Sequence, residues 1–229
     1  MYKTYVMHYT KLPERKKHIE NQLQSASIED YEFIEEYDKE QLTKGDLADY
    51  YDDSKFNFDK VAQITLNKTG ETQSCYKELS LASISLNIKH IVALRKFLEA
   101  DEDFALMIED DCLFREGDTA IRRLLNRAPL NWDVIFPGGA FGHEIIRVKS
   151  AHKDNQFLLA EHPATNTTSS MIFNKDSAEK MLDSCFPFSL PWDWQLNYVF
   201  AQNDFDVYHS NPYICTQISN KVQGFDSTA

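Results

Sequence analysis

Three consecutive carboxylates, Glu109, Asp110 and Asp111, come directly after an apolar run at residues 104–108. Adjacent carboxylates repel one another, and burying them costs free energy unless a cation or hydrogen-bond donors compensate. On an extended chain the side chains of Glu109 and Asp111 point to the same side, so both could address one ion or one ligand. Hard oxygen ligands suit Mg²⁺ or Mn²⁺, which also bind phosphate oxygens. The triplet therefore predicts a metal and diphosphate site, with an exposed acidic turn as the alternative.

A second candidate for chemistry is Asp193, which stands between Trp192 and Trp194. An aspartate held between two indoles could be partly desolvated, which would raise its pKa and suit it to act as a general base. Indole faces also suit the apolar faces of sugar rings. The alternative is that Asp193 opens a helix and both tryptophans belong to the core.

Glycine and histidine supply weaker candidates. Gly138 belongs to a Pro-Gly-Gly turn at residues 137–139 and allows close approach of the backbone to a ligand, although an ordinary turn fits equally well. His8, His90 and His209 each stand at the end of a predicted element or on a helix. Histidines in such places are more often structural than ligating.

The chain has 229 residues, a formal net charge of −12 and a pI near 5.0. Residues 29–59 contain 12 acidic and 3 basic residues, which predicts a solvated, partly irregular connection. No Lys/Arg cluster suggests nucleic-acid binding, and an anionic ligand such as a nucleotide would need a cation, most simply a divalent metal. The four cysteines show no CxxC spacing, which argues against zinc. The polar N-terminal residues and the lack of an apolar run of ~20 residues predict a soluble, cytoplasmic protein.

The elements that must position these residues follow from hydrophobic patterning. Short apolar runs predict strands at residues 4–8, 31–36, 104–108, 132–136, 157–160, 169–173, 205–208 and 213–216. Helical periodicity and composition predict helices at residues 14–24, 78–99, 118–127, 175–185 and 192–202. Alternating strands and helices predict an α/β sandwich. Ligands in such folds bind beyond the carboxyl ends of the strands, which is where the triplet stands.

Several blocks, in this order, make the chain similar to a known family over most of its length. They are MHYTKLPERKKHI, LSLASISLNIKHIVALRKFL, FALMIEDDCLF, NWDVIFPGG, TSSMIFNKDSAEKML, PWDWQL and NPYICTQ. On these blocks the chain resembles glycosyltransferase family 25, the group of bacterial lipooligosaccharide galactosyltransferases and collagen galactosyltransferases. It departs from the family pattern at Ala82-Ser83, where Gly-Glu is usual, at Lys89-His90, where Ser-His is usual, and at His8, where Asn is usual.

The resemblance implies a single GT-A domain over residues 1–229, a Rossmann-like α/β fold with a mostly parallel central sheet flanked by helices. It implies an inverting transfer of a sugar, galactose or glucose, from a UDP-sugar to a hydroxyl of a glycan or glycoconjugate, assisted by Mn²⁺ or Mg²⁺. Asp193 would be the base, Trp192 and Trp194 would meet the acceptor, and Glu109, Asp111 and His209 would hold the metal. The implied donor contacts are His8, Arg15, Asp38, Lys89, His90, Glu109, Asp110 and Gly138.

Two other functions compete with this prediction. A nucleotidyltransferase or sugar-phosphate enzyme would also need an acidic metal site, but it should carry a basic, glycine-rich phosphate loop, which the sequence lacks. A non-catalytic carbohydrate-binding or assembly protein derived from a glycosyltransferase is favoured by the altered helix motif at Ala82-Ser83 and Lys89-His90.

Overall fold

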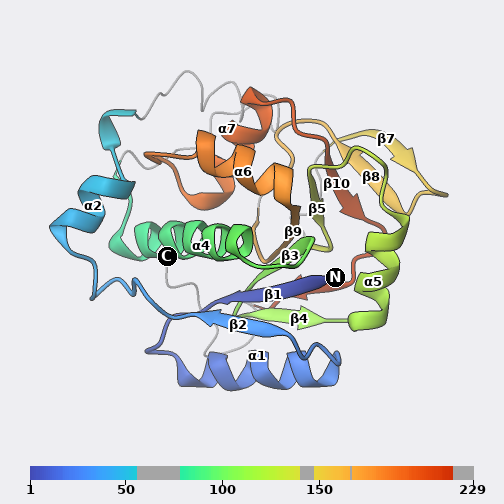
Figure 1. The fold of residues 1–229 in the computed structure, drawn as a ribbon, viewed down its shortest axis with the longest axis horizontal. Helices are drawn as coiled ribbons and strands as arrows, with labels where there is room; N and C mark the ends of the chain where they lie inside the picture. Colours follow the sequence, from blue (N-terminus) through green and yellow to red (C-terminus); the bar gives the residue numbers. More distant parts are fainter. Residues whose placement is uncertain (56–77, 140–146, 166, 219–229) are drawn as a thin grey trace.

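A mixed sheet of eight strands forms the centre of the computed structural model, which describes residues 1–55, 78–139, 147–165 and 167–218 (Figure 1). In sheet order the strands are β2 (Tyr31–Ile34), β1 (Tyr2–Met7), β3 (Phe104–Glu109), β9 (Ser170–Asn174), β5 (Val134–Phe136), β10 (Val207–Ser210), β8 (Phe157–Ala160) and β7 (Val148–His152). β1 pairs in parallel with β2 and β3, and β5 with β10, whereas β8 and β9 run antiparallel to their neighbours. The predicted α/β fold with helices around a central sheet is confirmed, and these two reversed strands make the sheet mixed.

The continuous apolar run of β3 is explained by cover on both faces of the sheet. Ala105 and Met107 pack into one core beneath α4 (Leu81–Glu99), α6 (Lys175–Ser184) and α7 (Trp192–Gln202). Leu106 and Ile108 pack into a second core with α1 (Pro13–Ser25) and α5 (Asp118–Arg127). Figure 1 shows α4, α6 and α7 gathered on one side of the sheet and α1 on the other. The carboxylates that follow Ile108 thus emerge from a strand whose central residues are fully buried.

Each predicted strand and helix has a counterpart in the structure, although several ends are displaced by one to three residues. The acidic segment also contains α2 (Lys44–Tyr50) and the short 3₁₀ helix η1 (Asp53–Lys55). Thr43 and Asp46 close a capping box at the start of α2, which explains why a helix begins inside this charged stretch. Residues 56–59 of the segment lie outside the described residues.

A small sheet of three strands, β4 (Cys112–Phe114), β11 (Cys215–Gln217) and β6 (Gly138–Gly139), brings distant parts of the chain to the triplet. β11 pairs antiparallel with β4, directly after Asp111, and parallel with β6. A Cβ on Gly138 would lie 2.6 Å from the Cys215 carbonyl oxygen and 2.7 Å from Ser170 Oγ. Gly138 is therefore required by close strand packing, and it does not line the pockets described below.

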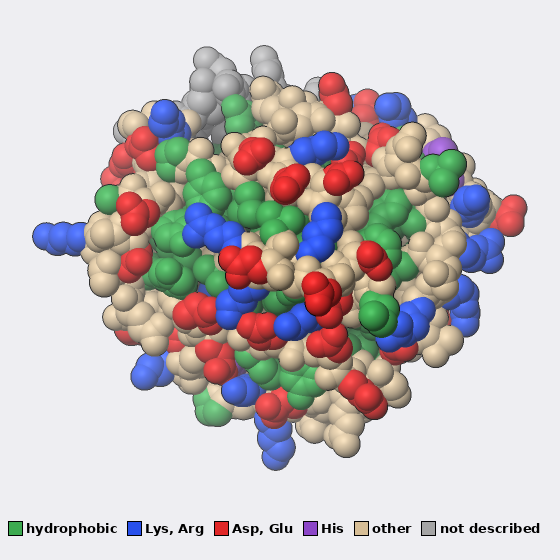
Figure 2. Space-filling model, viewed as in Figure 1, with side chains coloured by type: hydrophobic (Ala, Val, Ile, Leu, Met, Phe, Trp, Pro, Cys, Tyr) green, Lys and Arg blue, Asp and Glu red, His purple; other side chains and the backbone are tan. Residues whose placement is uncertain are grey.

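Charged side chains of both signs are interspersed on the face seen in Figure 2. None of the helices in the described ranges combines the length and the apolar character needed to cross a lipid bilayer.

Candidate active site

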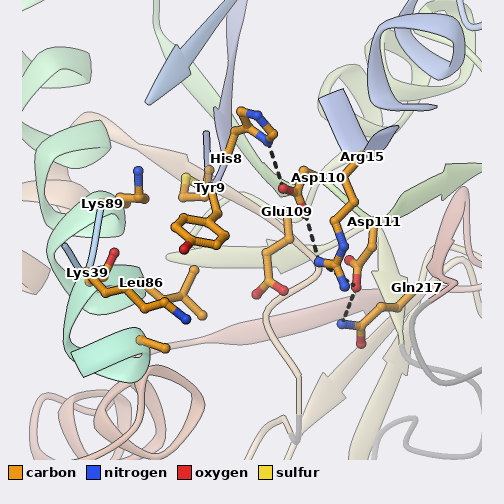
Figure 3. A pocket seen from close by; sticks show the side chains of 13 residues that line it. His8, Tyr9, Arg15, Lys39, Leu86, Lys89, Glu109, Asp110, Asp111 and Gln217 are labelled. Carbon is orange, nitrogen blue, oxygen red and sulfur yellow. Dashed lines mark hydrogen bonds and ion pairs between the residues drawn. The ribbon is translucent and has the colours of Figure 1, made fainter. Parts of the chain in front are cut away.

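A pocket opens at the carboxyl ends of β1 and β3, where the triplet stands (Figure 3). It encloses about 670 Å³ of space, part of it open to solvent. All three carboxylates, Glu109, Asp110 and Asp111, line it. The other lining residues come mainly from the ends of β1 and β11 and from one face of α4: Met7, His8, Tyr9, Arg15, Lys39, Ala82, Ser85, Leu86, Lys89 and Gln217.

Asp110 is held by two side chains from the N-terminal segment. Its carboxylate lies 2.8 Å from His8 Nδ1 and accepts a hydrogen bond of 3.0 Å from Arg15 Nη1. All three side chains are almost fully buried. Buried charges need such partners, so His8 and Arg15, which were predicted to contact the donor, serve first to orient and neutralise Asp110.

Glu109 has fewer compensating partners. Its Oε1 accepts a hydrogen bond of 2.6 Å from Thr168 Oγ1 and lies 3.9 Å from His90 Nε2. Burial, together with the nearby Asp111 carboxylate, raises the pKa of Glu109 to about 8. Burial also lowers the pKa of His90 to about 3, so the imidazole is neutral and offers no charge to Glu109.

Asp111 is reached from the far end of the chain. Gln217 Nε2 on β11 donates a hydrogen bond of 3.1 Å to Asp111 Oδ2, and Arg15 Nη1 lies 3.9 Å from the same oxygen. Gln217 and Thr168 were both missed as site residues, because their contacts depend on strand pairing across long stretches of sequence. The available signals were the positions of Thr168 in the block TSSMIFNKDSAEKML and of Gln217 in the block NPYICTQ.

Lys89 lines the pocket, and its positive charge is paired with the buried carboxylate of Asp38. Its ammonium donates to Asp38 Oδ1 at 2.8 Å and to the Ile34 carbonyl at 3.3 Å. Asp38 also accepts hydrogen bonds from the backbone N–H and the hydroxyl of Thr10. Asp38 itself is buried and does not line the pocket, so its predicted donor contact becomes support for Lys89.

A second pocket adjoins the first and contains the predicted base. It encloses about 560 Å³, including open space, and shares Leu86, Glu109 and Gln217 with the first. Asp193 lines it from the first turn of α7. The remaining lining residues are Ser83, Asn87, Thr167, Thr168, Pro191 and Trp192. Glu109 thus stands between the pocket that holds the triplet and the pocket that holds Asp193.

The two tryptophans, predicted to meet the acceptor, are placed differently in the structure. Trp192 is only 2% exposed and stacks on the His90 ring at a centroid distance of 4.9 Å and an interplanar angle of 11°. That indole face is therefore taken by protein. Trp194 is half-buried and lies outside both pocket linings, and its backbone N–H donates to Asp193 Oδ1 at 2.9 Å.

His209 is not brought to the carboxylates. Its Nε2 lies 2.8 Å from the Ala164 carbonyl, its Nδ1 lies 3.3 Å from the Tyr213 hydroxyl, and its ring stacks on Phe136. Both ring nitrogens already face protein groups, so the structure does not bring His209 to the metal site predicted for it. His90, predicted to contact the donor, is fully buried behind Glu109 and lines neither pocket.

The carboxylates of the first pocket are the candidate ligands for a divalent ion. Within the described residues no group of three His, Cys, Asp or Glu side chains is arranged as a ready metal site. Glu109 and Asp111 nevertheless place two carboxylates in one pocket, and burial together with the charge of Asp111 raises the pKa of Glu109. Added positive charge would relieve the repulsion between the two carboxylates, so these residues fit a hard cation.

Comparisons with solved structures return distant likenesses. The chain is 10% identical to a glycosyltransferase involved in glycosylation of the major capsid of PBCV-1, covering 95% of this chain and 93% of that one at a TM-score of 0.43. It is 10% identical to a Drosophila β-1,4-galactosyltransferase 7 mutant in complex with manganese, UDP-Gal and xylobiose (96% and 71% covered, TM-score 0.40). Mouse xyloside xylosyltransferase 1 is 6% identical (90% and 71% covered, TM-score 0.42). At these TM-scores the likenesses carry no argument about chemistry.

The fold and the pockets define an α/β protein with an acidic pocket at the carboxyl ends of β1 and β3. More particularly, the chain belongs to glycosyltransferase family 25 (LPS biosynthesis protein), whose sequence model matches residues 1–195. The protein is thus a glycosyltransferase, as its resemblance predicted. No curated protein matches the chain.

Proposed function

We propose that the protein is a metal-assisted, inverting hexosyltransferase, which moves galactose or glucose from a UDP-sugar to a hydroxyl of a glycan or glycoconjugate. One observation carries this proposal: Glu109 joins a pocket lined by three carboxylates to a second pocket lined by Asp193. A donor with its diphosphate in the first pocket would place its sugar toward the second, where an acceptor hydroxyl can approach.

The first pocket would bind the diphosphate. Glu109 and Asp111 would hold a Mn²⁺ or Mg²⁺ ion, which supplies positive charge to the leaving nucleotide. Asp110 stays paired with His8 and Arg15, so it contributes to the shape of the pocket more than to its net charge. Lys89 and Tyr9, on the opposite wall in Figure 3, would face the nucleoside part of the donor.

Proton transfer would take place in the second pocket. Asp193 takes the proton from the acceptor hydroxyl as that oxygen attacks the anomeric carbon on the face opposite the nucleotide. The bond from the anomeric carbon to the diphosphate oxygen breaks, and UDP leaves with that electron pair. The transition state is oxocarbenium-like, as in glycoside hydrolysis, and attack from the opposite face inverts the configuration.

The test is release of UDP from UDP-galactose and UDP-glucose with Mn²⁺, with and without EDTA, across a panel of glycan acceptors. We expect turnover that EDTA abolishes. Asp193→Asn should lower the rate by about 10²–10⁴-fold while UDP-sugar binding persists, and Asp111→Asn should lose Mn²⁺-dependent UDP-sugar binding. Glu179→Gln, an exposed acid on α6, is the matched control and should behave as wild type.

Two outcomes would contradict the proposal. Normal transfer by Asp193→Asn would remove the base from that residue. Binding of UDP-sugars without release of UDP on any acceptor would favour the non-catalytic, carbohydrate-binding alternative.

A further inference from the structure

The helix α4 lies between the two pockets and contributes side chains to both. Leu86 and Lys89 line the first pocket, and Ser83, Leu86 and Asn87 line the second. Ser85 Oγ donates to the Tyr37 carbonyl at 2.7 Å, which ties the same stretch of helix to the segment after β2. The position of α4 therefore bears on both pockets at once.

Asn87 fixes the segment that leads into α7. Its Nδ2 donates a hydrogen bond of 2.8 Å to the Leu190 carbonyl, and the side chain is fully buried. A carbonyl can only accept, so this bond also fixes which way the amide faces. Leu190 is followed by Pro191, the residue that caps α7, and Pro has no N–H with which to anchor the segment itself. The amide of Asn87 thus holds the chain three residues before Asp193.

His90 contacts Trp192, the first residue of α7. It lies one turn after Asn87, so the two side chains share a face of α4. Its ring stacks on Trp192 at 4.9 Å and 11°, and neither ring nitrogen has a hydrogen-bond partner among the described residues. The contribution of His90 to this contact therefore comes from its ring face.

We propose that Asn87 and His90 are positioning residues that set the place of Asp193 relative to the donor pocket. The inference rests on the proposed function, because it assigns them to the residue named as the base. Neither side chain needs to touch substrate: together they clamp residues 190–192, the last residues before Asp193. The opposite contacts of α4, through Lys89 to Asp38 and Ser85 to Tyr37, fix the helix against the donor side. Misplacement of a reacting group by about 1 Å can cost on the order of 10²-fold in rate, so the clamp matters for catalysis more than for binding.

The experiment separates rate from binding in the full chain with Mn²⁺ present. Asn87→Leu keeps a similar volume and loses the bond to Leu190. We expect its kcat for UDP release to fall about tenfold or more, with the Kd for UDP-glucose and UDP-galactose changed less than about twofold. Asn203→Leu is the matched control, because Asn203 Nδ2 likewise donates to a backbone carbonyl, that of Val199, at the other end of α7. It should keep the wild-type kcat.

Two further comparisons distinguish positioning from a general structural role. His90→Phe keeps a flat ring against Trp192 and should retain most of the wild-type kcat, whereas His90→Ala should not. In an Asp193→Asn background, Asn87→Leu should cause little further loss in the residual rate, because the two changes act through one group.

Several results would overturn the inference while leaving the proposed function intact. They are an unchanged kcat in Asn87→Leu, an equal loss of UDP-sugar affinity, His90→Phe as impaired as His90→Ala, or fully additive losses with Asp193→Asn. A wild-type protein that releases no UDP, or an Asp193→Asn variant that is unimpaired, would instead remove the proposed function together with this inference.

Discussion

The two adjoining pockets share Glu109, but different kinds of interaction hold the side chains of each pocket in place. In the first, charges meet charges: Asp110 is paired with His8 and Arg15, and Lys89 is paired with Asp38. In the second, neutral side chains bond the backbone. Asn87 is the clearest case: its Nδ2 donates to the Leu190 carbonyl at 2.8 Å.

This difference fits a division of labour between the pockets. A site for a charged diphosphate and its metal gains from fixed charges, because electrostatic interactions are strong where water is excluded. A site where an acceptor hydroxyl must meet a base depends on the exact positions of its side chains. Hydrogen bonds from neutral side chains to the backbone fix these positions without adding net charge. The first pocket should therefore respond to changes of charge and pH, and the second to the loss of single neutral contacts.

The largest effect is expected from Arg15→Met, which leaves the buried Asp110 with His8 as its remaining side-chain partner within the described ranges. Removing one partner of a buried ion pair costs about 3–5 kcal/mol. We expect the free energy of unfolding, measured in urea, to fall by about 3 kcal/mol. Arg123→Met, at an exposed site on α5, should change it by less than about 0.5 kcal/mol.

A companion variant sharpens this result. If the cost comes from uncompensated charge, Arg15→Met combined with Asp110→Asn should be less destabilised than the sum of the two single changes. Strict additivity, or a cost below about 1 kcal/mol for Arg15→Met alone, would show that the first pocket does not depend on this pair.

The next effect concerns the pH dependence of metal binding at Glu109. Burial and the Asp111 carboxylate raise the pKa of Glu109 to about 8, so in the metal-free protein Glu109 is protonated at pH 6–7 and must lose that proton to bind Mn²⁺. Affinity for Mn²⁺ should rise with pH, by at most about tenfold per unit, and level off above the pKa. Calorimetry in buffers of different ionisation enthalpy measures the released proton. A pH-independent affinity between pH 6 and 8 would place the metal elsewhere.

The raised pKa of Glu109 also predicts the direction in which stability changes with pH. A carboxyl group whose pKa is raised on folding contributes stability that is fully present below its unfolded pKa of about 4.3 and is lost as pH rises through its folded pKa. The metal-free protein should therefore lose the Glu109 contribution as the pH approaches about 8, and Mn²⁺ should restore stability over that range. Thermal unfolding at pH 6 and pH 8, with and without Mn²⁺, measures both changes.

The sequence predicts the first pocket better than the second for a physical reason. β1, β3 and α4 are strongly patterned, and the triplet directly follows a buried strand, so local signals were enough to locate it. Asp193 was identified by its type and neighbours, but its surroundings were not. The indole of Trp192 is stacked on a histidine about a hundred residues away in sequence, and no local pattern reports such a contact.

The residues that the sequence analysis missed, or expected in another place, have the same explanation. Gln217 reaches Asp111, which lies 106 positions earlier in the sequence, only because β11 pairs with β4. His209 was predicted from its place after a late strand, and the register of β10 instead turns it toward Ala164 and Tyr213. Gly138 has the conformational freedom that ligand approach requires, but atoms of Cys215 and Ser170 occupy the space beside it. In each case tertiary packing, which the sequence states only indirectly, decided the outcome.

The smallest expected effect tests the residue at which the two pockets meet. Thr168→Val keeps the shape of the side chain and removes the hydroxyl that donates to Glu109 Oε1 at 2.6 Å. One such bond contributes about 1 kcal/mol. Because this hydroxyl lowers the pKa of Glu109 against the larger effect of burial, its loss should raise that pKa further. The pH at which Mn²⁺ affinity levels off should then move upward, while Thr119→Val, at an exposed site on α5, should leave it unchanged. An unmoved pH profile in Thr168→Val would mean that the second pocket exerts no control over the charge of Glu109, and that the two pockets are joined by position alone.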